Sequence, residues 1–549
     1  MTTCNTPLAS LALAASQWPS AAIFRTPIID DQKIPVAPHI IGYGTVTYNE
    51  LYNYVETTAR YWYAKLSEDG IPTGSIVGYC SRGGSYMDFV HIHGLSKAGY
   101  VPQAFTRLPQ SIEIVKALLE KSGAKALLYE EGYFDSAESL MGPDLKVYPT
   151  FKDIPTTQLS EALPDLSEPQ PNDIKYVFHT SGSTSGLPKL VPYTSRSVET
   201  LLRKAAMTPR PPPGRPSPDA VSWISSACHV SGFSLLLAAM HQGACIIQPT
   251  CLPPPIAEFK SMFKLGGLTR VSIFTPLLSR ILEVCRTDPE LLDLFKNMKS
   301  IAHGGAVLPS SDLEWAKLNG LSLVDAYGST ECGIPLMISR ANKVGTPEHA
   351  YLRPIQLLKE DGTPLIRYRF DPVMEGNDDD DGAALKELVV LRDSADLPHH
   401  SLLGGHEDFH TGDLFEEVKP GEYIHRGRVD DWIKMAHGCR CDASLLEDDV
   451  KTLCKDLFSD CLVVGSSQPS PVLIVEADTD EEERLRQEIY RRIVNSDRHR
   501  KRFSHEQISS PDAIIIVPSG SMMRTTTKGN IRRKAMEEAF GDRIRSIFS

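Results

Sequence analysis

At its most informative point the chain reads Phe178-His179-Thr180-Ser181-Gly182-Ser183-Thr184-Ser185-Gly186-Leu187-Pro188-Lys189, directly after an apolar pair at 176–177. The stretch gathers hydroxyls, glycines and one lysine. Glycines let the backbone approach a ligand closely, exposed N–H groups form an anion nest, and lysine adds positive charge. The stretch therefore predicts a loop that wraps a polyphosphate. It is not the common P-loop, which ends in Gly-Lys-Ser/Thr, and a plain surface loop is the alternative.

Four further motifs follow this loop along the chain. They read Asp325-Ala326-Tyr327-Gly328-Ser329-Thr330-Glu331, Phe409-His410-Thr411-Gly412-Asp413-Leu414-Phe415, Arg426-Gly427-Arg428-Val429-Asp430-Asp431-Trp432-Ile433-Lys434 and Arg524-Thr525-Thr526-Thr527-Lys528-Gly529-Asn530-Ile531-Arg532-Arg533. In this order and spacing the set resembles the adenylate-forming superfamily, which includes acyl-CoA synthetases, luciferases and adenylation domains of nonribosomal peptide synthetases. The resemblance covers nearly the whole chain. The motifs are most similar to those of fungal synthetase-like enzymes and adenylate-forming reductases.

Composition limits the class of protein. The chain has 549 residues, which exceeds one ordinary core and predicts two or more domains. The formal net charge of −12 argues against nonspecific nucleic-acid binding. The 11 cysteines include no Cys-x-x-Cys pair, which favours reduced thiols over a zinc site. No apolar run is long enough to span a bilayer, and no basic residue precedes Arg25 as a signal peptide requires. We therefore expect a cytoplasmic protein.

Hydrophobic patterns predict the elements of an α/β fold. Residues 48–66 and 87–98 have the period of helices, and residues 75–79, 125–129, 221–224, 244–247, 271–274 and 387–391 are strand candidates. After Asp430 the pattern restarts, with strand candidates at 461–464, 472–475 and 513–517 and a charged helix between the last two. We expect a large N-terminal domain, residues 1–429, of mixed sheets layered with helices. A small α+β C-terminal domain, residues 430–549, follows it.

The resemblance implies a nucleotide site in the large domain. Activating a carboxylate with ATP requires a held α-phosphate, neutralised charge and excluded water. Tyr327 would stack on adenine, Thr330 would bond the α-phosphate and Glu331 would hold Mg²⁺, which takes one or two carboxylates plus phosphates. A capped turn is the alternative for this motif. The other expected nucleotide contacts are Thr180, Ser181, Gly182, Ser183, Thr184, Lys189, Gly304, Gly305, Ala306, Asp325, Ala326, Gly328 and Ser329.

The later motifs imply ribose contacts and a hinge. Asp413 is the candidate for the ribose hydroxyls, since an ionised carboxylate accepts two hydrogen bonds. Arg428 would bond the ribose or phosphate, and Asp430 falls where the family has the hinge about which the small domain rotates. Gly438 belongs to the expected thiol-acceptor face, although the segment before it is one residue longer than usual. A turn aspartate and a surface charge cluster are the alternatives. His410 stands where an arginine is frequent, and no chemistry is expected of it.

Lys528 is the expected catalytic lysine. A lysine that bridges the carboxylate and the α-phosphate would stabilise charge in the transition state. The usual order in the family is Gly-Lys, whereas this chain reads Lys528-Gly529, which leaves Lys534 as a possible substitute.

The acid pocket is expected around Cys228-His229-Val230-Ser231-Gly232-Phe233. Amino-acid-activating domains carry an aspartate here that pairs with the substrate ammonium. The matching position is Val230, and no acidic residue occurs from Trp223 to Gln248. An unpaired ammonium would be costly, so we predict an acid without an α-amino group, of aryl, keto or polyketide-derived type. His229 resembles the family's gate residue near the acyl-phosphate, and a core histidine is the alternative.

Taken together, these expectations describe an adenylate-forming ligase of secondary metabolism. It would convert a carboxylic acid and ATP into acyl-AMP and pyrophosphate, and then pass the acyl group to the phosphopantetheine thiol of a carrier protein. A freestanding acyl- or aryl-CoA ligase is one alternative, and a non-catalytic nucleotide-binding relative is another. A P-loop phosphotransferase is disfavoured by the motifs. The absence of a Gly-x-Asp-Ser site and of a reductase fingerprint leaves open whether the chain is the excised first domain of a longer protein.

Overall fold

The structure is a computed structural model that describes residues 6–30, 39–105, 112–132, 140–142, 144–155, 162–166, 168–180, 188–340, 351–373, 385–436, 440–500, 502, 504–524 and 531–548. The chain divides into two compact units. The large unit contains most residues up to 424, and the small unit contains residues 425–549 together with residues 412–415. The predicted α/β class is confirmed.

One sheet of the large unit has six described strands in the order β6-β5-β3-β4-β7-β8. Their bounds are β3 Ile76–Cys80, β4 Val101–Phe105, β5 Ala126–Tyr129, β6 Lys146–Pro149, β7 Ile174–Thr180 and β8 Lys189–Thr194. All neighbours are parallel except β7 and β8. Buried parallel strands are apolar along their length, which explains why 75–79 and 125–129 were recognisable as strands.

The second sheet has nine described strands in the order β15-β14-β13-β12-β11-β9-β10-β1-β2. Their bounds are β1 Ala22–Ile29, β2 Ile40–Thr47, β9 Ala220–Ser222, β10 Cys245–Ile247, β11 Arg270–Phe274, β12 Ser300–Gly304, β13 Leu323–Ser329, β14 Gly333–Ile338 and β15 Arg353–Pro354. The strands from β13 through β1 run parallel to one another. Their carboxyl ends therefore share one edge of the sheet.

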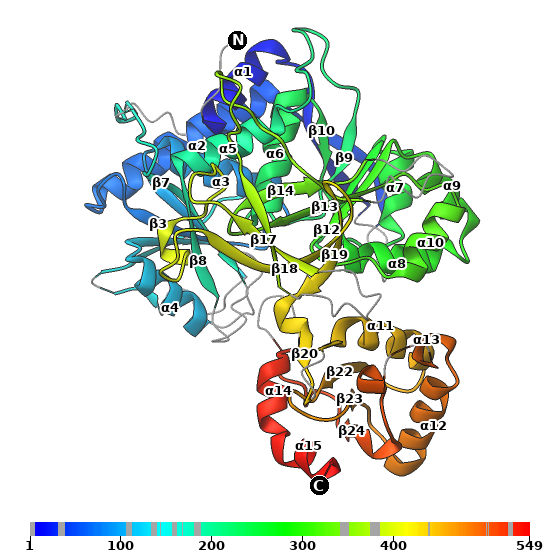
Figure 1. The fold of residues 1–549 in the computed structure, drawn as a ribbon. Coiled ribbons are helices and arrows are strands. Elements are labelled where there is room, and N and C mark those ends of the chain that lie inside the picture. The colour runs from blue at the N-terminus through cyan, green and yellow to red at the C-terminus, as the bar shows by residue number, and fades with distance from the viewer. Residues whose placement is uncertain are drawn as a thin grey trace. The chain divides into compact units, whose positions relative to one another are not determined.

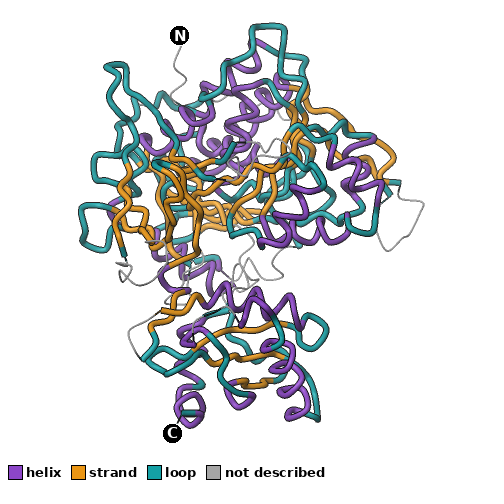
Figure 2. The backbone as a smooth tube through the Cα atoms, turned by 45° about the vertical axis from the view of Figure 1, so that its right-hand side comes forward, coloured by secondary structure: helices purple, strands orange, loops and turns teal. Residues whose placement is uncertain are grey.

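Helices form three layers around these two sheets, as Figures 1 and 2 show. The helices of the large unit are α1 Pro7–Gln17, α2 Tyr48–Glu68, α3 Tyr86–Lys97, α4 Ile112–Ser122, α5 Ser195–Ala205, α6 Val230–Gln242, α7 Glu258–Lys264, α8 Thr275–Cys285, α9 Pro289–Lys296 and α10 Ser310–Leu318. One core joins α1, α2, α3, α5 and α6 to strands of both sheets. Helix α4 packs on the outer face of the six-stranded sheet, and α7 to α10 pack on the outer face of the nine-stranded one. The predicted layering of mixed sheets with helices is confirmed.

Local sequence fixes where the central helices begin and end. Thr47 starts α2 with a capping box, in which its hydroxyl accepts from the Glu50 N–H and the Glu50 carboxylate accepts from the Thr47 N–H. Gly243 ends α6 in the left-handed region with φ 65°. A Cβ at Gly243 would lie 2.8 Å from Trp18 and Pro216, so both conformation and space call for glycine there.

A further sheet has the order β16-β17-β18-β19, with bounds Tyr368–Pro372, Leu385–Val390, Phe409–Lys419 and Glu422–Arg428. The small unit contains the hairpin β20 Trp432–Lys434 and β21 Arg440–Asp442. It is built on the sheet β22 Asp460–Val464, β23 Val472–Glu476 and β24 Ile514–Val517. Its helices are α11 Ala443–Cys454, α12 Glu482–Val494, α13 Asp497–Arg500, α14 Arg533–Ala539 and α15 Gly541–Ile547, and they surround this sheet (Figure 1).

Two features bear on the environment of the chain. No helix among the described residues combines the length and the apolar character needed to cross a membrane. The nine cysteines within the described ranges are all free thiols.

Candidate active site

The candidate nucleotide site lies where β11, β12 and β13 end. Ligands of open α/β sheets bind outside the carboxyl ends of parallel strands. Gly304 is the last residue of β12, and the segment 325–331 runs from β13 into the turn before β14. His303 and Asp325 are register partners on the two strands. The structure thus brings the predicted glycine pair and the predicted Asp325–Glu331 motif to the same edge.

The glycine pair is required by close backbone approach. A Cβ at Gly304 would lie 2.2 Å from the carbonyl oxygen of Ala326, and Gly305 has φ 85°. The Thr275 hydroxyl is 2.9 Å from the carbonyl oxygen of Ala306 and 3.2 Å from that of Gly304. Thr275 at the start of α8 therefore holds the turn on which adenine and substrate are expected to lie, a role that the sequence did not reveal.

The turn that bears Thr330 and Glu331 is fastened to a distant strand. The Tyr193 hydroxyl, at the end of β8, donates to the Thr330 carbonyl oxygen at 2.8 Å. The Ser329 hydroxyl accepts from the Cys332 N–H at 3.2 Å and closes the turn. Tyr327 is buried in β13. Tyr193 is the second contributor that sequence reasoning missed, since nothing local marks it.

A buried histidine lies under the same edge. His303 Nδ1 is 3.9 Å from Asp325 Oδ1, and its ring is almost fully buried. Burial lowers the pKa of His303 to about 4, so the ring is neutral at pH 7. Ile301 and His303 are two residues apart on β12 and are both buried. This alternation along the strand is the sequence signal that could have identified His303 as a buried residue.

The predicted phosphate loop is bracketed by described strands. Thr180 ends β7 and Lys189 begins β8, and the two residues are antiparallel partners. Ser181, Gly182, Ser183 and Thr184 lie outside the described residues. His179 is buried against Phe105, and burial lowers its pKa to about 4. We therefore assign His179 to the packing behind the loop and not to chemistry.

The residues expected to line the acid pocket lie at the start of α6. His229 is the N-cap residue, and its Nδ1 accepts from the Ser231 N–H at 3.1 Å. Val230 is fully buried. Phe274 ends β11 with 39% of its surface exposed, its ring centroid is 6.1 Å from that of His229, and it lies next to Gly305. The neighbourhood therefore combines an exposed aromatic wall with a histidine and contains no carboxylate at the Val230 position.

A buried ion pair lies near Cys332, the residue that follows the Thr330–Glu331 turn. Lys204 Nζ on α5 is 2.8 Å from Asp396 Oδ1, with side-chain exposures of 1% and 2%. The Tyr368 hydroxyl donates to the other carboxylate oxygen. Burial, with Asp396 and Glu331 nearby, raises the pKa of the Cys332 thiol well above its usual range. The charged pair therefore lies within electrostatic reach of the residue that follows Glu331.

The predicted ribose contacts meet in the small unit. Arg428 Nη1 donates to Asp413 Oδ1 at 3.3 Å, and His425 Nε2 is 3.9 Å from the same oxygen. Asp413 is buried to about nine-tenths of its side chain, whereas Arg428 is half-exposed. The structure therefore brings Asp413 and Arg428 into contact, with His425 as a neighbour. His410 Nδ1 lies 3.1 Å from a carboxylate oxygen of Glu387.

Several expected residues fall where the structure gives little detail. Asp430 lies in the short helix η4 Val429–Asp431, and its side chain is outside the description. Gly438 and Lys528 lie outside the described residues altogether. Lys534 is exposed in the first turn of α14.

Glu331 is the residue proposed to bind Mg²⁺, which needs only one or two carboxylates from the protein. Within the described ranges, no three His, Cys, Asp or Glu side chains gather so as to hold a metal ion. Mg²⁺ prefers one or two carboxylates with phosphates and water, and the Glu331 side chain on the turn beside Thr330 suits that donor set.

We expect Glu331→Gln to raise the Mg²⁺ concentration for half-maximal activity by about tenfold or more, because a neutral amide binds a hard cation more weakly than a carboxylate. The check is a Mg²⁺ titration of pyrophosphate release at saturating ATP. Glu314→Gln, at an exposed position on α10, is the control and should leave the midpoint unchanged. Equal midpoints for all three proteins would remove Glu331 from the metal site.

Comparisons with known proteins find matching families and relatives. Residues 30–356 match the family described as AMP-binding enzyme, and residues 430–549 match the AMP-binding enzyme C-terminal domain. The chain is 30% identical over 530 residues to the AMP-binding domain-containing enzyme iboA of Amanita muscaria, covering 94% of this chain and 98% of that protein. It is 24% identical to the adenylate-forming reductase stbB of Stachybotrys bisbyi, over 69% of this chain and 33% of that one.

A solved structure shows the same fold. The O-succinylbenzoate coenzyme A synthetase of Bacillus subtilis, in complex with ATP and magnesium ion, superimposes with a TM-score of 0.67 at 16% identity. The superposition covers 96% of this chain and 99% of that one.

Proposed function

We propose that this chain, which belongs to the AMP-binding enzyme family, activates a carboxylic acid without an α-amino group. We further propose that it passes the acyl group to the phosphopantetheine thiol of a carrier protein. Membership of the family makes the chain an adenylate-forming enzyme, which couples ATP to acyl-adenylate formation. The acid and the acceptor are the proposed part. We also propose residues 1–429 and 430–549 as its domains, and a reducing compartment, the cytoplasm, as its location.

One observation carries the proposal for the first half-reaction. The ends of β12 and β13 place the glycine pair beside Ala326, while Tyr193 ties the Thr330–Glu331 turn to the strand that begins at Lys189. Binding ATP requires a backbone surface for the flat base, a carboxylate for the cation and a positive charge for the phosphates, here the lysine at the start of β8.

The chemistry then follows from the roles of the residues. Thr330 would hold the α-phosphate in line with the substrate carboxylate, so that the carboxylate oxygen attacks phosphorus and pyrophosphate leaves. Glu331 would hold Mg²⁺, which supplies positive charge to the phosphates. Lys189 would face the departing phosphates, and Lys528 would stabilise the charge that develops between the carboxylate and the α-phosphate. Asp413 would accept hydrogen bonds from the ribose hydroxyls.

The pocket residues support an acid without an ammonium group. Val230 is fully buried where amino-acid-activating relatives place an acidic partner, and the nearby exposed surface is the aromatic Phe274. A desolvated ammonium without a counter-charge is expensive, whereas an aryl or other unsaturated acyl group gains by packing against an aromatic ring. Aryl, keto and polyketide-derived acids are therefore the proposed substrate class.

We expect pyrophosphate release, with ATP and Mg²⁺, to be strong for one or more aryl, keto or polyketide-like acids and at least about a hundredfold weaker for the corresponding α-amino acids. The measurement is a coupled pyrophosphate assay over matched pairs of acids that differ only in the α-substituent. Preference for the amino member of a pair would overturn the pocket assignment. Silence across the panel in protein that still binds ATP would favour a non-catalytic relative.

The acceptor is tested separately with the acid identified in that panel. Mass spectrometry should detect the acyl group on the phosphopantetheine arm of a carrier protein, with little acyl-CoA formed from free CoA. The reverse result would identify a freestanding acyl-CoA ligase.

A further inference from the structure

Arg533 is a largely buried arginine to which neither the motifs nor the proposed chemistry gives a role. It begins α14 and lines a cavity of about 290 Å³ in the small unit. The walls carry three acidic and three basic side chains, which are Asp431, Glu447, Asp460, Lys451, Arg524 and Arg533. The Arg533 side chain is 14% exposed. A guanidinium held this far from water needs several partners to compensate for its lost hydration.

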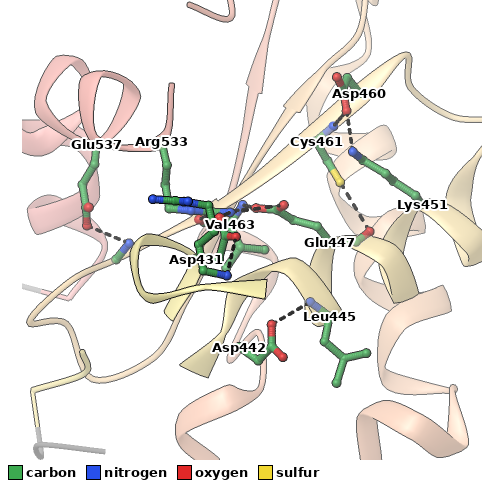
Figure 3. A network of polar contacts seen from close by, with 12 residues as sticks. Asp431, Asp442, Leu445, Glu447, Lys451, Asp460, Cys461, Val463, Arg533 and Glu537 are labelled. Atoms are coloured by element: carbon green, nitrogen blue, oxygen red, sulfur yellow. Dashed lines mark hydrogen bonds and ion pairs between the residues drawn. The ribbon is translucent and has the colours of Figure 1, made fainter. Parts of the chain in front are cut away.

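Its partners come from three separate elements, as Figure 3 shows. The Arg533 guanidinium donates to the Glu447 carboxylate on α11 and to the Val463 carbonyl oxygen on β22. Glu447 also accepts from the Val463 N–H at 2.7 Å. Nη2 of Arg533 reaches Asp431 Oδ1, in η4, at 3.5 Å. Arg533 therefore joins the core of the small unit to the short turn that follows β19.

The same turn leads directly to the ribose candidates. Asp431 uses its other oxygen, Oδ2, to accept from the Arg428 N–H at 3.2 Å. Arg428 then donates from Nη1 to Asp413 Oδ1 at 3.3 Å. The space around this contact is tight, because a Cβ at Gly412 would lie 3.0 Å from Arg428 Nη2. A continuous path of ion pairs and hydrogen bonds thus runs from Glu447 through Arg533, Asp431 and Arg428 to Asp413.

Each link in this path restrains the next. Arg428 is half-exposed, so its long side chain has rotamer freedom to lose before it can hold Asp413 in one orientation. The Asp431 carboxylate holds the Arg428 backbone N–H with one oxygen, and Arg533, which is itself paired with Glu447, donates to the other oxygen. Fixing the supporting groups of a binding carboxylate improves its geometry without adding a contact to the ligand.

We infer that Arg533 is a positioning residue for ribose recognition, acting through Asp431 and Arg428 on the carboxylate of Asp413. This inference rests on the proposed role of Asp413 in the function described above. It assigns to α14 a task in nucleotide selection, in addition to following the segment that contains Lys528. The inference predicts that removing Arg533 changes the selectivity for the ribose hydroxyls, and not only the stability of the protein.

The test compares the dissociation constants of ATP and 2′,3′-dideoxy-ATP, measured by titration calorimetry with Mg²⁺ and without acid. We expect the intact chain to bind ATP about tenfold more tightly, because hydroxyls that donate to a carboxylate make strong hydrogen bonds. Asp413→Ala should bring the ratio close to one. Arg533→Met, and Asp431→Ala at a more exposed position, should each lower it by roughly threefold.

Arg502→Met is the matched control. Arg502 is also buried and also pairs with a carboxylate of α11, Asp449, at 2.6 Å, but that pair lies off the path from Glu447 to Asp413. Arg502→Met should lower the unfolding temperature as Arg533→Met does and leave the nucleotide ratio unchanged. Arg533→Lys, which keeps the charge and loses the planar fork, should give an intermediate ratio.

The outcomes separate the inference from the function on which it rests. An unchanged ratio in Asp413→Ala would remove the ribose role and this inference with it. A collapsed ratio in Asp413→Ala, with wild-type ratios in both Arg533→Met and Asp431→Ala, would overturn the inference and leave the ribose role in place. An equal drop of the nucleotide ratio in Arg502→Met would show that the effect is general destabilisation, and it would also overturn the inference.

Discussion

Lys528→Ala is expected to lower the rate of acyl-adenylate formation by about a hundredfold to a thousandfold while ATP binding stays nearly unchanged. The reason is that a positive charge between the attacking carboxylate and the α-phosphate contributes most where charge develops, in the transition state, and little in the ground-state complex. The effect should therefore fall on kcat in ATP–pyrophosphate exchange, with a small change in the dissociation constant of ATP.

The described residues that flank positions 525–530 contact each other and the sheet of the small unit. Arg524 and Ile531 form an antiparallel bridge, and the Arg532 N–H donates to the Met523 carbonyl oxygen at 2.7 Å. Arg524 is in turn held by Asp460 at 2.8 Å and by Glu476 at 3.0 Å. Arg524 is thus linked to β22 and β23, and Ile531 is bridged to Arg524.

Lys534→Ala is the control for this prediction, because Lys534 is the other lysine near the motif and is exposed on α14. It should retain the wild-type exchange rate. A loss of exchange in Lys534→Ala together with a normal Lys528→Ala enzyme would transfer the catalytic role to Lys534. Normal exchange in both variants would remove a motif lysine from the mechanism.

Strands and motif positions were predictable because their signals are local. The strand expected at residues 75–79 is β3 Ile76–Cys80, and the one expected at 271–274 is β11 Arg270–Phe274. Both belong to parallel sheets, whose strands are buried on two faces and therefore apolar along their length. The Gly304–Gly305 pair was proposed through the family resemblance, and the structure adds a physical reason for it, since close backbone approach at Gly304 and the positive φ of Gly305 favour glycine.

The contacts that support the candidate site were not predictable in this way. Tyr193 bonds to a carbonyl 137 residues away, and Lys204 pairs with Asp396 on a turn that only the packing of α5 brings near. Arg533 sits inside a motif, yet its partners Glu447 and Asp431 come from other elements. A single sequence contains the ends of such pairs but not the tertiary arrangement that joins them, so these positions looked like ordinary polar residues.

The buried pair of Lys204 and Asp396 leads to the second large effect. Lys204→Met should lower the free energy of unfolding of the large unit by about 3–5 kcal/mol, because it leaves the Asp396 carboxylate buried without its counter-charge. Tyr368 still donates one hydrogen bond to that carboxylate, but a neutral donor compensates only part of the loss. Urea denaturation followed by tryptophan fluorescence measures the change, and Trp62 and Trp223 in the core of the unit report on it.

Two further variants separate loss of charge pairing from loss of packing. Lys204→Met combined with Asp396→Leu should recover most of the lost stability, since replacing a buried ion pair with apolar groups is often neutral. Lys65→Met removes an exposed lysine that lies 3.4 Å from Glu68 and should cost less than about 1 kcal/mol.

If the single and double variants were equally unstable, packing of the lysine stem and not its charge would hold α5. If the recovered double variant also had normal catalysis, the pair would serve stability alone.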